Sequence, residues 1–208
     1  MAGIQNSWGE TNKNINRNII LSPKDAAELS LDWKIHGFNL VKAEIMKKCR
    51  YNLEGMNGDE YSAREFYMNA EKIAFSKGIY FYRQMPQSIT KKMTPKRFDV
   101  YKTPYLLEKL LIKHNFSFSL IENIHNLRLS LYKELLNLYE ENKSSFTNEE
   151  KIEIKALLED NEKLLNEIDI EKYNPKKKLL YIDKTFEKVR IKFLGLKFSF
   201  KRRHYEIP

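Results

Sequence analysis

The chain has 208 residues, of which 42% are hydrophobic and 12% aromatic, and its formal net charge is +9. Such a chain is expected to fold, and it is long enough to bury a core without disulfides or metals. A single cysteine excludes an internal disulfide framework and a cysteine-based zinc site. No apolar run reaches the roughly 20 residues of a membrane span, and we expect no secretory signal. An intracellular protein is therefore predicted, either mitochondrial or cytoplasmic.

Residues 1–21 predict an extended N-terminal arm. Polar residues dominate this segment with little periodicity, and Gly3 and Gly9 interrupt it. Trp8 is the exception, and a Trp in a polar segment commonly anchors that segment to a surface. We predict that Trp8 anchors the arm and that the arm is ordered only through contacts, chiefly with a partner.

Two helices are predicted in the first half of the chain. Ser22, Pro23 and Asp25 supply an N-cap hydroxyl, a proline in the first turn and an early acid. The apolar spacing that follows predicts a helix to about Arg50. A second helix is predicted over residues 59–76, followed by a short β-leaning segment at residues 79–82.

The middle of the chain predicts an antiparallel helical hairpin. Thr103 and Pro104 indicate the start of a short helix. Capping boxes at residues 119–122 and 147–150 then predict two long helices with a short polar connection. Leucine and isoleucine recur on both at three- and four-residue spacing, so residues 119–170 are expected to pack in coiled-coil fashion.

Asn161 falls within this predicted seam between Leu158 and Leu165. A polar residue in a coiled-coil seam can fix the register of the two helices at some cost in stability. The alternative is that Asn161 points away from the seam into solvent. The sequence leaves both readings open.

The last 35 residues differ from the rest in pattern and in charge. Val189, Ile191 and Phe193 alternate with cations, and a second alternation follows Gly195, which predicts a β-hairpin. In such a hairpin the apolar side chains can pack on the helices while the cations face outward. Residues 174–208 carry 11 Lys and Arg against three acids, a net charge of +8, so only +1 belongs to residues 1–173.

This basic tail predicts a partner-binding surface. RNA, anionic lipid head groups and an acidic protein face would each attract it. The alternatives are a solvated edge strand whose lysines deter aggregation, and a lysine excess that reflects AT-rich codons. The residues expected to meet the polyanion or partner are Lys176, Lys177, Lys178, Lys192, Lys197, Lys201, Arg202 and Arg203.

Leu131, Tyr132 and Lys133 resemble the motif that opens the first helix of the LYR family. Members of that family are small helical mitochondrial proteins that serve as accessory subunits or assembly factors of respiratory complexes and the organellar ribosome. The resemblance implies a helix interface at these three residues, and Asn161 of the predicted seam is expected at a helix interface as well. Lys133 stands where the family has arginine, and the segment lies in mid-chain where the family has it near the N-terminus.

We find no motif that predicts catalysis. The four histidines are His36, His114, His125 and His204. None pairs with carboxylates at the spacing of metal ligands. A Gly-rich phosphate loop, a nucleophile elbow, and metalloprotease and dinucleotide signatures are all absent from the sequence. We therefore expect a protein that is not an enzyme and needs no cofactor or metal.

Together these patterns predict a mainly α fold, an antiparallel helical hairpin or bundle with an extended arm and a small basic C-terminal β-hairpin. The expected parts are an arm at residues 1–21, a helical domain at 22–173 and a β-leaning extension at 174–208. The expected function is that of a non-catalytic structural or accessory subunit of a large assembly, docking other subunits through the arm and the basic extension. The alternative is an RNA-binding protein of ribosomal type with the basic tail on RNA.

Overall fold

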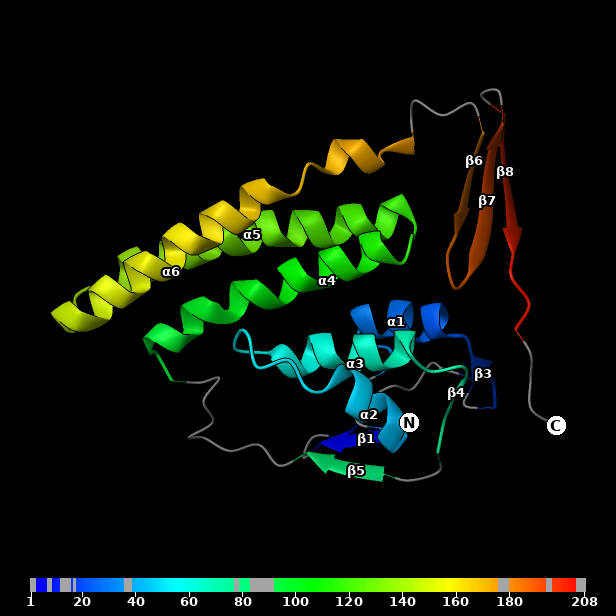
Figure 1. Ribbon diagram of the computed structural model, residues 1–208, viewed down its shortest axis with the longest axis horizontal. Helices are drawn as coiled ribbons and strands as arrows, with labels where there is room; N and C mark the ends of the chain where they lie inside the picture. Colours follow the sequence, from blue (N-terminus) through cyan, green and yellow to red (C-terminus); the bar gives the residue numbers. More distant parts are fainter. Residues whose placement is uncertain are drawn as a thin grey trace. The chain divides into compact units, whose positions relative to one another are not determined.

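The computed structural model describes residues 3–6, 9–11, 16, 18–35, 39–76, 79–82, 92–175, 180–193 and 196–204. Figure 1 shows the elements, and the mainly α fold with a small C-terminal β-sheet is confirmed. The chain forms two compact units rather than three consecutive parts. The first joins Met1–Asn52, Ser62–Met85 and Pro175–Pro208, and the second joins Leu53–Tyr61 and Pro86–Asn174. The predicted arm and the predicted C-terminal extension thus belong to the same unit.

Helix α1 of the first unit, Pro23–Leu31, begins as predicted. The Ser22 hydroxyl accepts a hydrogen bond from the Asp25 backbone N–H and donates one to the Asp25 carboxylate. The helix ends at Leu31, however, and Trp33 adopts a positive φ of 57° that a helix cannot continue through. A separate helix α2 follows at Ala43–Cys49, so the prediction of one helix to Arg50 is wrong.

Short strands connect distant parts of the first unit. Strand β1 (Gly3–Asn6) pairs antiparallel with β2 (Gly9–Thr11) and parallel with β5 (Ile79–Tyr82). Strand β3 (Ile20–Leu21) pairs antiparallel with β4 (Ile73–Ala74), which replaces the end of the predicted second helix. That helix, α3, spans only Gly58–Met68. Strands of the predicted arm thus pair within the chain, and a partner's part in ordering the arm stays a prediction.

The second unit contains the predicted helical hairpin. A 3-10 helix η2 (Pro95–Tyr101) leads into α4 (Lys102–Lys113), which is followed by α5 (Phe118–Asn142), α6 (Asn148–Glu167) and the 3-10 helix η3 (Ile170–Tyr173). The capping box at Thr147 and Glu150 is present. Ser117, two residues before the predicted cap, accepts the N–H of Leu120 and begins α5. Thr103 lies inside α4 and does not cap it.

The segment before α3 approaches the start of α4 at Gly55. Its φ is +79°, a conformation that favours glycine. A Cβ there would lie 3.1 Å from the Lys102 Cβ and 3.3 Å from the Asp99 carbonyl oxygen. The missing side chain therefore permits a close contact between this segment and the η2–α4 junction.

The core of the second unit lies between η2, α5 and α6. Its fully or nearly buried side chains are Phe98, Tyr101, Leu135, Tyr139, Phe146, Ile154 and Leu158. The ring of Phe98 packs edge-on against Tyr139, with the ring centroids 6.4 Å apart. Ile154 and Leu158 belong to the predicted seam, whereas Leu127, predicted with them, is 51% exposed. The seam of α5 is thus rotated from the predicted one.

Asn161 is fully buried, which excludes the solvent-facing alternative. Its side-chain N–H donates to the Phe98 carbonyl oxygen at 3.0 Å. The hydrogen bond therefore joins α6 to η2 and does not cross to α5. Asn161 fixes the position of the 3-10 helix on the hairpin.

The C-terminal sheet has three antiparallel strands in the order β6–β7–β8: Leu180–Lys184, Lys188–Phe193 and Leu196–Lys201 (Figure 1). Strands β7 and β8 are the predicted hairpin. Strand β6 was missed, although Leu180 and Ile182 already alternate with Tyr181 and Asp183 in the sequence.

Candidate docking site on the C-terminal sheet

The register of the C-terminal sheet sorts its side chains into two unlike faces. Successive residues of a strand point to opposite faces, and directly paired residues share a face. Phe193 pairs with both Leu180 and Leu196, whereas its neighbour Lys192 pairs with Tyr181 and Lys197. Apolar rows therefore fall on one side of the sheet and polar rows on the other.

We call the first side the apolar face. Its members are Leu180, Ile182, Lys184, Val189, Ile191, Phe193, Leu196, Phe198 and Phe200. Six of the large apolar side chains on this face are exposed, including Leu196 at 63% and Phe198 at 47%. Among the described residues of the first unit, no helix covers these side chains, contrary to the expectation that they pack on helices. Lys184, at the end of β6, is the one charged residue among the members of this face.

We call the other side the cationic face. Its members are Tyr181, Asp183, Lys188, Arg190, Lys192, Lys197, Ser199 and Lys201. Lys192 lies directly opposite Lys197, and Lys188 lies directly opposite Lys201. Like charges that face each other across a ladder destabilise it. The sheet therefore carries an electrostatic repulsion that a bound anion would relieve.

A groove of about 440 Å³ runs over the cationic face. Tyr181, Asp183, Lys192 and Lys197 are among the residues that line it. Asp183 is only 5% exposed, and its Oδ2 accepts a hydrogen bond from Arg190 Nη1 at 3.2 Å. Its Oδ1 is buried and has no hydrogen-bond partner in the part of the chain that the structure describes. The groove thus combines cations with a buried carboxylate oxygen that has no hydrogen-bond partner among the described residues.

Helix α1 holds the sheet at the turn between β6 and β7. Arg202, just after β8, donates to both carboxylate oxygens of Asp25, at 2.6 and 3.2 Å, and to the Thr185 carbonyl oxygen. The His204 ring stacks on Phe186, with the ring centroids 4.1 Å apart. Arg202 was predicted to meet a partner, but this geometry assigns it to the fold.

Glu28 completes the junction between α1 and the sheet. Its carboxylate accepts the Phe186 backbone N–H at 2.8 Å. Burial raises the pKa of Glu28 to about 7, and the nearby charge of Asp25 raises the pKa further, while the Phe186 N–H and Arg202 oppose this shift. This junction therefore contains a carboxyl group that titrates near neutrality.

The other predicted partner-binding cations divide into two groups. Lys197, Lys201 and Arg203 are exposed and Lys192 is half-buried, and all of them except Arg203 belong to the cationic face. Residues 176–178, the predicted lysine cluster, lie outside the described residues, as does the predicted arm anchor Trp8.

The residues that resemble the LYR motif lie on α5 in the second unit. Leu131 and Tyr132 are half-buried, and Lys133 is exposed. The ring of Tyr132 packs edge-on against Tyr101 with the ring centroids 6.2 Å apart. Asn161 donates a hydrogen bond to η2, as described above. Among the described residues, no hydrogen bond or ring contact joins Asn161 to Leu131, Tyr132 or Lys133.

A buried ionic cluster in the second unit was not predicted. Arg128 on α5 and Glu108 on α4 are both fully buried and form an ion pair. His125 Nδ1 lies 3.0 Å from the other Glu108 oxygen, and Arg128 also donates to the Leu164 carbonyl oxygen. The sequence contained a signal, because Arg128 follows Ile121 and Ile124 at helical spacing on the apolar stripe.

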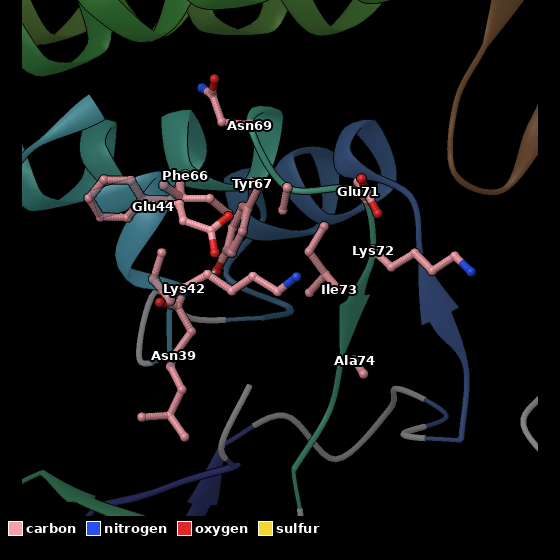
Figure 2. Close-up of a pocket in the computed structure, with 14 residues that line it drawn as sticks. Asn39, Lys42, Glu44, Phe66, Tyr67, Asn69, Glu71, Lys72, Ile73 and Ala74 are labelled. Carbon is pink, nitrogen blue, oxygen red and sulfur yellow. The ribbon is translucent and has the colours of Figure 1, made fainter. Parts of the chain in front are cut away.

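A second cavity of the first unit, about 420 Å³, is lined by residues 39–42, 44–45, 66–67 and 69–74 (Figure 2). The Asn39 amide N–H donates to the Tyr67 hydroxyl at 3.3 Å. Burial raises the pKa of Tyr67, so the phenol stays protonated near neutral pH. Lys42 and Lys72 at this cavity are exposed. The cavity lining combines these neutral groups with charges of both signs, because Glu44 and Glu71 also belong to it.

Among the described residues, no group of three or more His, Cys, Asp or Glu side chains could hold a metal ion. In the same part of the chain, no helix has the length and apolar character needed to cross a membrane. We found no match to the chain among family models, curated proteins or solved structures. Function must therefore be inferred from the residues themselves.

Proposed function

We propose that this chain is a non-catalytic accessory subunit of a larger protein assembly and that it docks through the apolar face of its C-terminal sheet. The observation that carries the proposal is the row of exposed Phe193, Phe198 and Phe200 on one side of a regular ladder. Large apolar side chains on a contiguous exposed surface are typical of binding sites, whereas single exposed ones are ordinary.

The size of the apolar face fits a protein interface. Each of the three phenylalanines is about half exposed, and a Phe side chain can bury about 150–250 Å², so the rings alone offer roughly 300 Å². The exposed Leu180, Ile182 and Leu196 enlarge this area. A standard interface buries about 800 Å² per partner around an apolar centre with a polar rim. The apolar face supplies such a centre.

The separation of charged and apolar side chains onto opposite faces of the sheet supports the interpretation of the apolar face as a binding surface. Most of the cations of the sheet, which would discourage association, lie on the opposite face. A second sheet or helix layer could pack on the apolar face without burying a charge other than Lys184. A mitochondrial assembly would agree with the resemblance of residues 131–133 to the LYR family.

The test compares two double variants in the tagged full chain. Phe198→Ser with Phe200→Ser removes the centre of the apolar face. Leu127→Ser with Ile152→Ser removes two exposed apolar residues from α5 and α6 and serves as the matched control. Each protein is recovered from its own cells in mild detergent, and the co-purifying proteins are quantified by mass spectrometry.

We expect the sheet variant to lose the proteins that co-purify with the parent, and the control to keep them. Both variants should melt like the parent because the replaced side chains are exposed. Light scattering on the purified parent shows whether a second copy of the chain covers the face. Full retention of the co-purifying proteins by the sheet variant would refute docking through this face.

A further inference from the structure

We propose that the groove on the cationic face binds single-stranded RNA, with phosphates at Lys192 and Lys197 and a ribose hydroxyl at Asp183. The three residues line one groove, and they come from all three strands of the sheet. The cationic face is the side of the sheet opposite the apolar face used for docking, although Ile191 and Phe198 of the apolar face also line the groove.

The arrangement of the lysines favours an anionic ligand. Lys192 and Lys197 are direct cross-strand partners, and Lys188 and Lys201 repeat this arrangement four residues along each strand. Neighbouring strands lie about 4.8 Å apart, so each pair holds two positive charges close together. The repulsion weakens the sheet when the groove is empty. A phosphate between the lysines would convert the repulsion into two charge-assisted hydrogen bonds.

Asp183 restricts which anion can bind. An ionised carboxylate accepts hydrogen bonds and donates none, and a buried acceptor without a partner is unfavourable. Asp183 Oδ1 is such an acceptor, and Arg190 holds the carboxylate through Oδ2. A bare polyphosphate has no donor for Oδ1 and would be repelled by it. RNA carries both groups, since the ribose 2′-OH can donate while the phosphates meet the lysines.

Tyr181 adds an aromatic ring to the same groove, directly paired with Lys192. Aromatic rings beside cations are the usual platform for unpaired bases, because any base can stack on them. A membrane surface fits less well. Membrane-binding elements present cations and apolar side chains to the bilayer together, whereas this sheet separates them onto opposite faces.

The first test is a salt titration of binding to a labelled single-stranded RNA, followed by fluorescence anisotropy with the full chain. Lys192→Ser with Lys197→Ser is compared with Lys113→Ser and Lys155→Ser, two exposed lysines of α4 and α6 that give the same change in net charge. Each phosphate contact contributes about 0.7 to the slope of log affinity against log salt. We expect the sheet variant to lose about 1.4 of that slope and the control to keep it.

The melting temperature of the same variant shows separately whether it is still folded. Because the substitutions remove a like-charge pair, the sheet variant should melt at or slightly above the temperature of the parent while it loses RNA affinity. A lower affinity with an unchanged melting temperature cannot be attributed to unfolding. Equal slopes for the sheet variant and the control would overturn the phosphate site.

The second test concerns Asp183 and uses DNA of the same sequence, which lacks the 2′-OH. We expect the parent to prefer RNA by about 10-fold, the value of a hydrogen bond to a charged group. Asp183→Ala should abolish the preference, and Asp183→Asn, which keeps an acceptor oxygen, should retain part of it. Equal binding of RNA and DNA by the parent would overturn the ribose contact. Stronger binding to vesicles rich in phosphatidylserine, or to polyglutamate, than to RNA would replace RNA as the partner.

Discussion

The helical hairpin and the C-terminal sheet use the same kinds of residue in opposite ways. In the hairpin, Ile154 and Leu158 are buried and even an arginine, Arg128, is fully enclosed with Glu108. In the sheet, Phe198 and Phe200 are exposed, and cations oppose cations across the ladder. The hairpin buries these side chains within its own unit, whereas the sheet leaves large apolar side chains exposed on one face and places lysines opposite each other on the other face.

This difference predicts which substitutions should lower stability and which should lower the proposed binding. A buried and paired group contributes to stability mainly when its partner is present, and its loss is felt in the isolated protein. An exposed aromatic ring, or a lysine opposite another lysine, contributes little to folding stability. Its favourable interactions form mainly when a partner binds. Substitutions in the hairpin should therefore lower the free energy of unfolding, and those on the sheet should lower binding.

The largest loss of stability is expected from Arg128→Ala. The substitution leaves the enclosed Glu108 carboxylate without its arginine, and His125 is the side chain that still contacts it among the described residues. Breaking a buried ion pair by removing one partner costs about 3–5 kcal/mol. Chemical denaturation of the purified chain, followed by circular dichroism at 222 nm, would measure the loss.

A double variant makes this prediction sharper. Arg128→Met with Glu108→Leu replaces the ion pair by apolar groups of similar length, and such exchanges are often neutral or stabilising. We expect the double variant to recover most of the stability that Arg128→Ala loses. A double variant as unstable as the single one would indicate that other contacts of Arg128, such as the one to the Leu164 carbonyl oxygen, matter more than the pair.

The second prediction compares the loss of stability caused by one substitution in the hairpin with that caused by one substitution in the sheet. Leu158→Ala should lower the free energy of unfolding by about 2–5 kcal/mol, because it opens a cavity in the buried core that also contains Phe98 and Leu135. Phe198→Ala should change it by no more than about 0.5 kcal/mol, since the ring is exposed. Both values come from the same denaturation measurement. A large loss for Phe198→Ala would mean that the apolar face is covered in the isolated chain.

The hairpin could be predicted from sequence because its signals are local. The Thr147 and Glu150 capping box and the spacing of Ile154 and Leu158 lie within one helix, and each was placed correctly. The error at Ser117 is a shift of two residues between neighbouring serines, each of which could cap the helix. Arg128 was missed because the leucines beside it form an equally regular stripe.

The first unit could not be predicted in the same way because its order depends on distant contacts. The continuation of α1 past Leu31 was supported by the apolar spacing, yet Trp33 turns the chain with a positive φ. The pairing of β3 with β4 and the attachment of Arg202 to Asp25 join residues far apart in the sequence. Alternation in the tail predicted two faces, but it could not show that the apolar one is exposed.

The third prediction concerns the attachment of the sheet to α1. Arg202→Ala removes a bidentate contact to the buried Asp25 and should cost about 1–3 kcal/mol. Arg203→Ala, its exposed neighbour, is the matched control and should have almost no effect. Hydrogen exchange read by mass spectrometry should show faster exchange in α1 and in strands β6 to β8 for Arg202→Ala. If both variants exchange alike, the contact does not hold the sheet.

The smallest expected effect is a pH dependence of the same attachment. Burial raises the pKa of Glu28 from its ordinary value of 4.5 to about 7 in the folded chain. Between these two values the folded state holds a proton that the unfolded state has lost. The contribution of Glu28 to stability is therefore fully present below pH 4.5 and is lost as the pH rises through about 7.

Glu28→Gln isolates this group, because a glutamine keeps an oxygen that can accept the Phe186 N–H but does not titrate. We expect the free energy of unfolding of the parent to fall between pH 4.5 and 7 relative to that of the variant, with a slope of up to one proton. Thermal melts of both proteins across this range would measure the difference. Parallel pH profiles would mean that Glu28 stays accessible to water in the folded chain, and the attachment would then depend on Arg202 and on the stacking of His204.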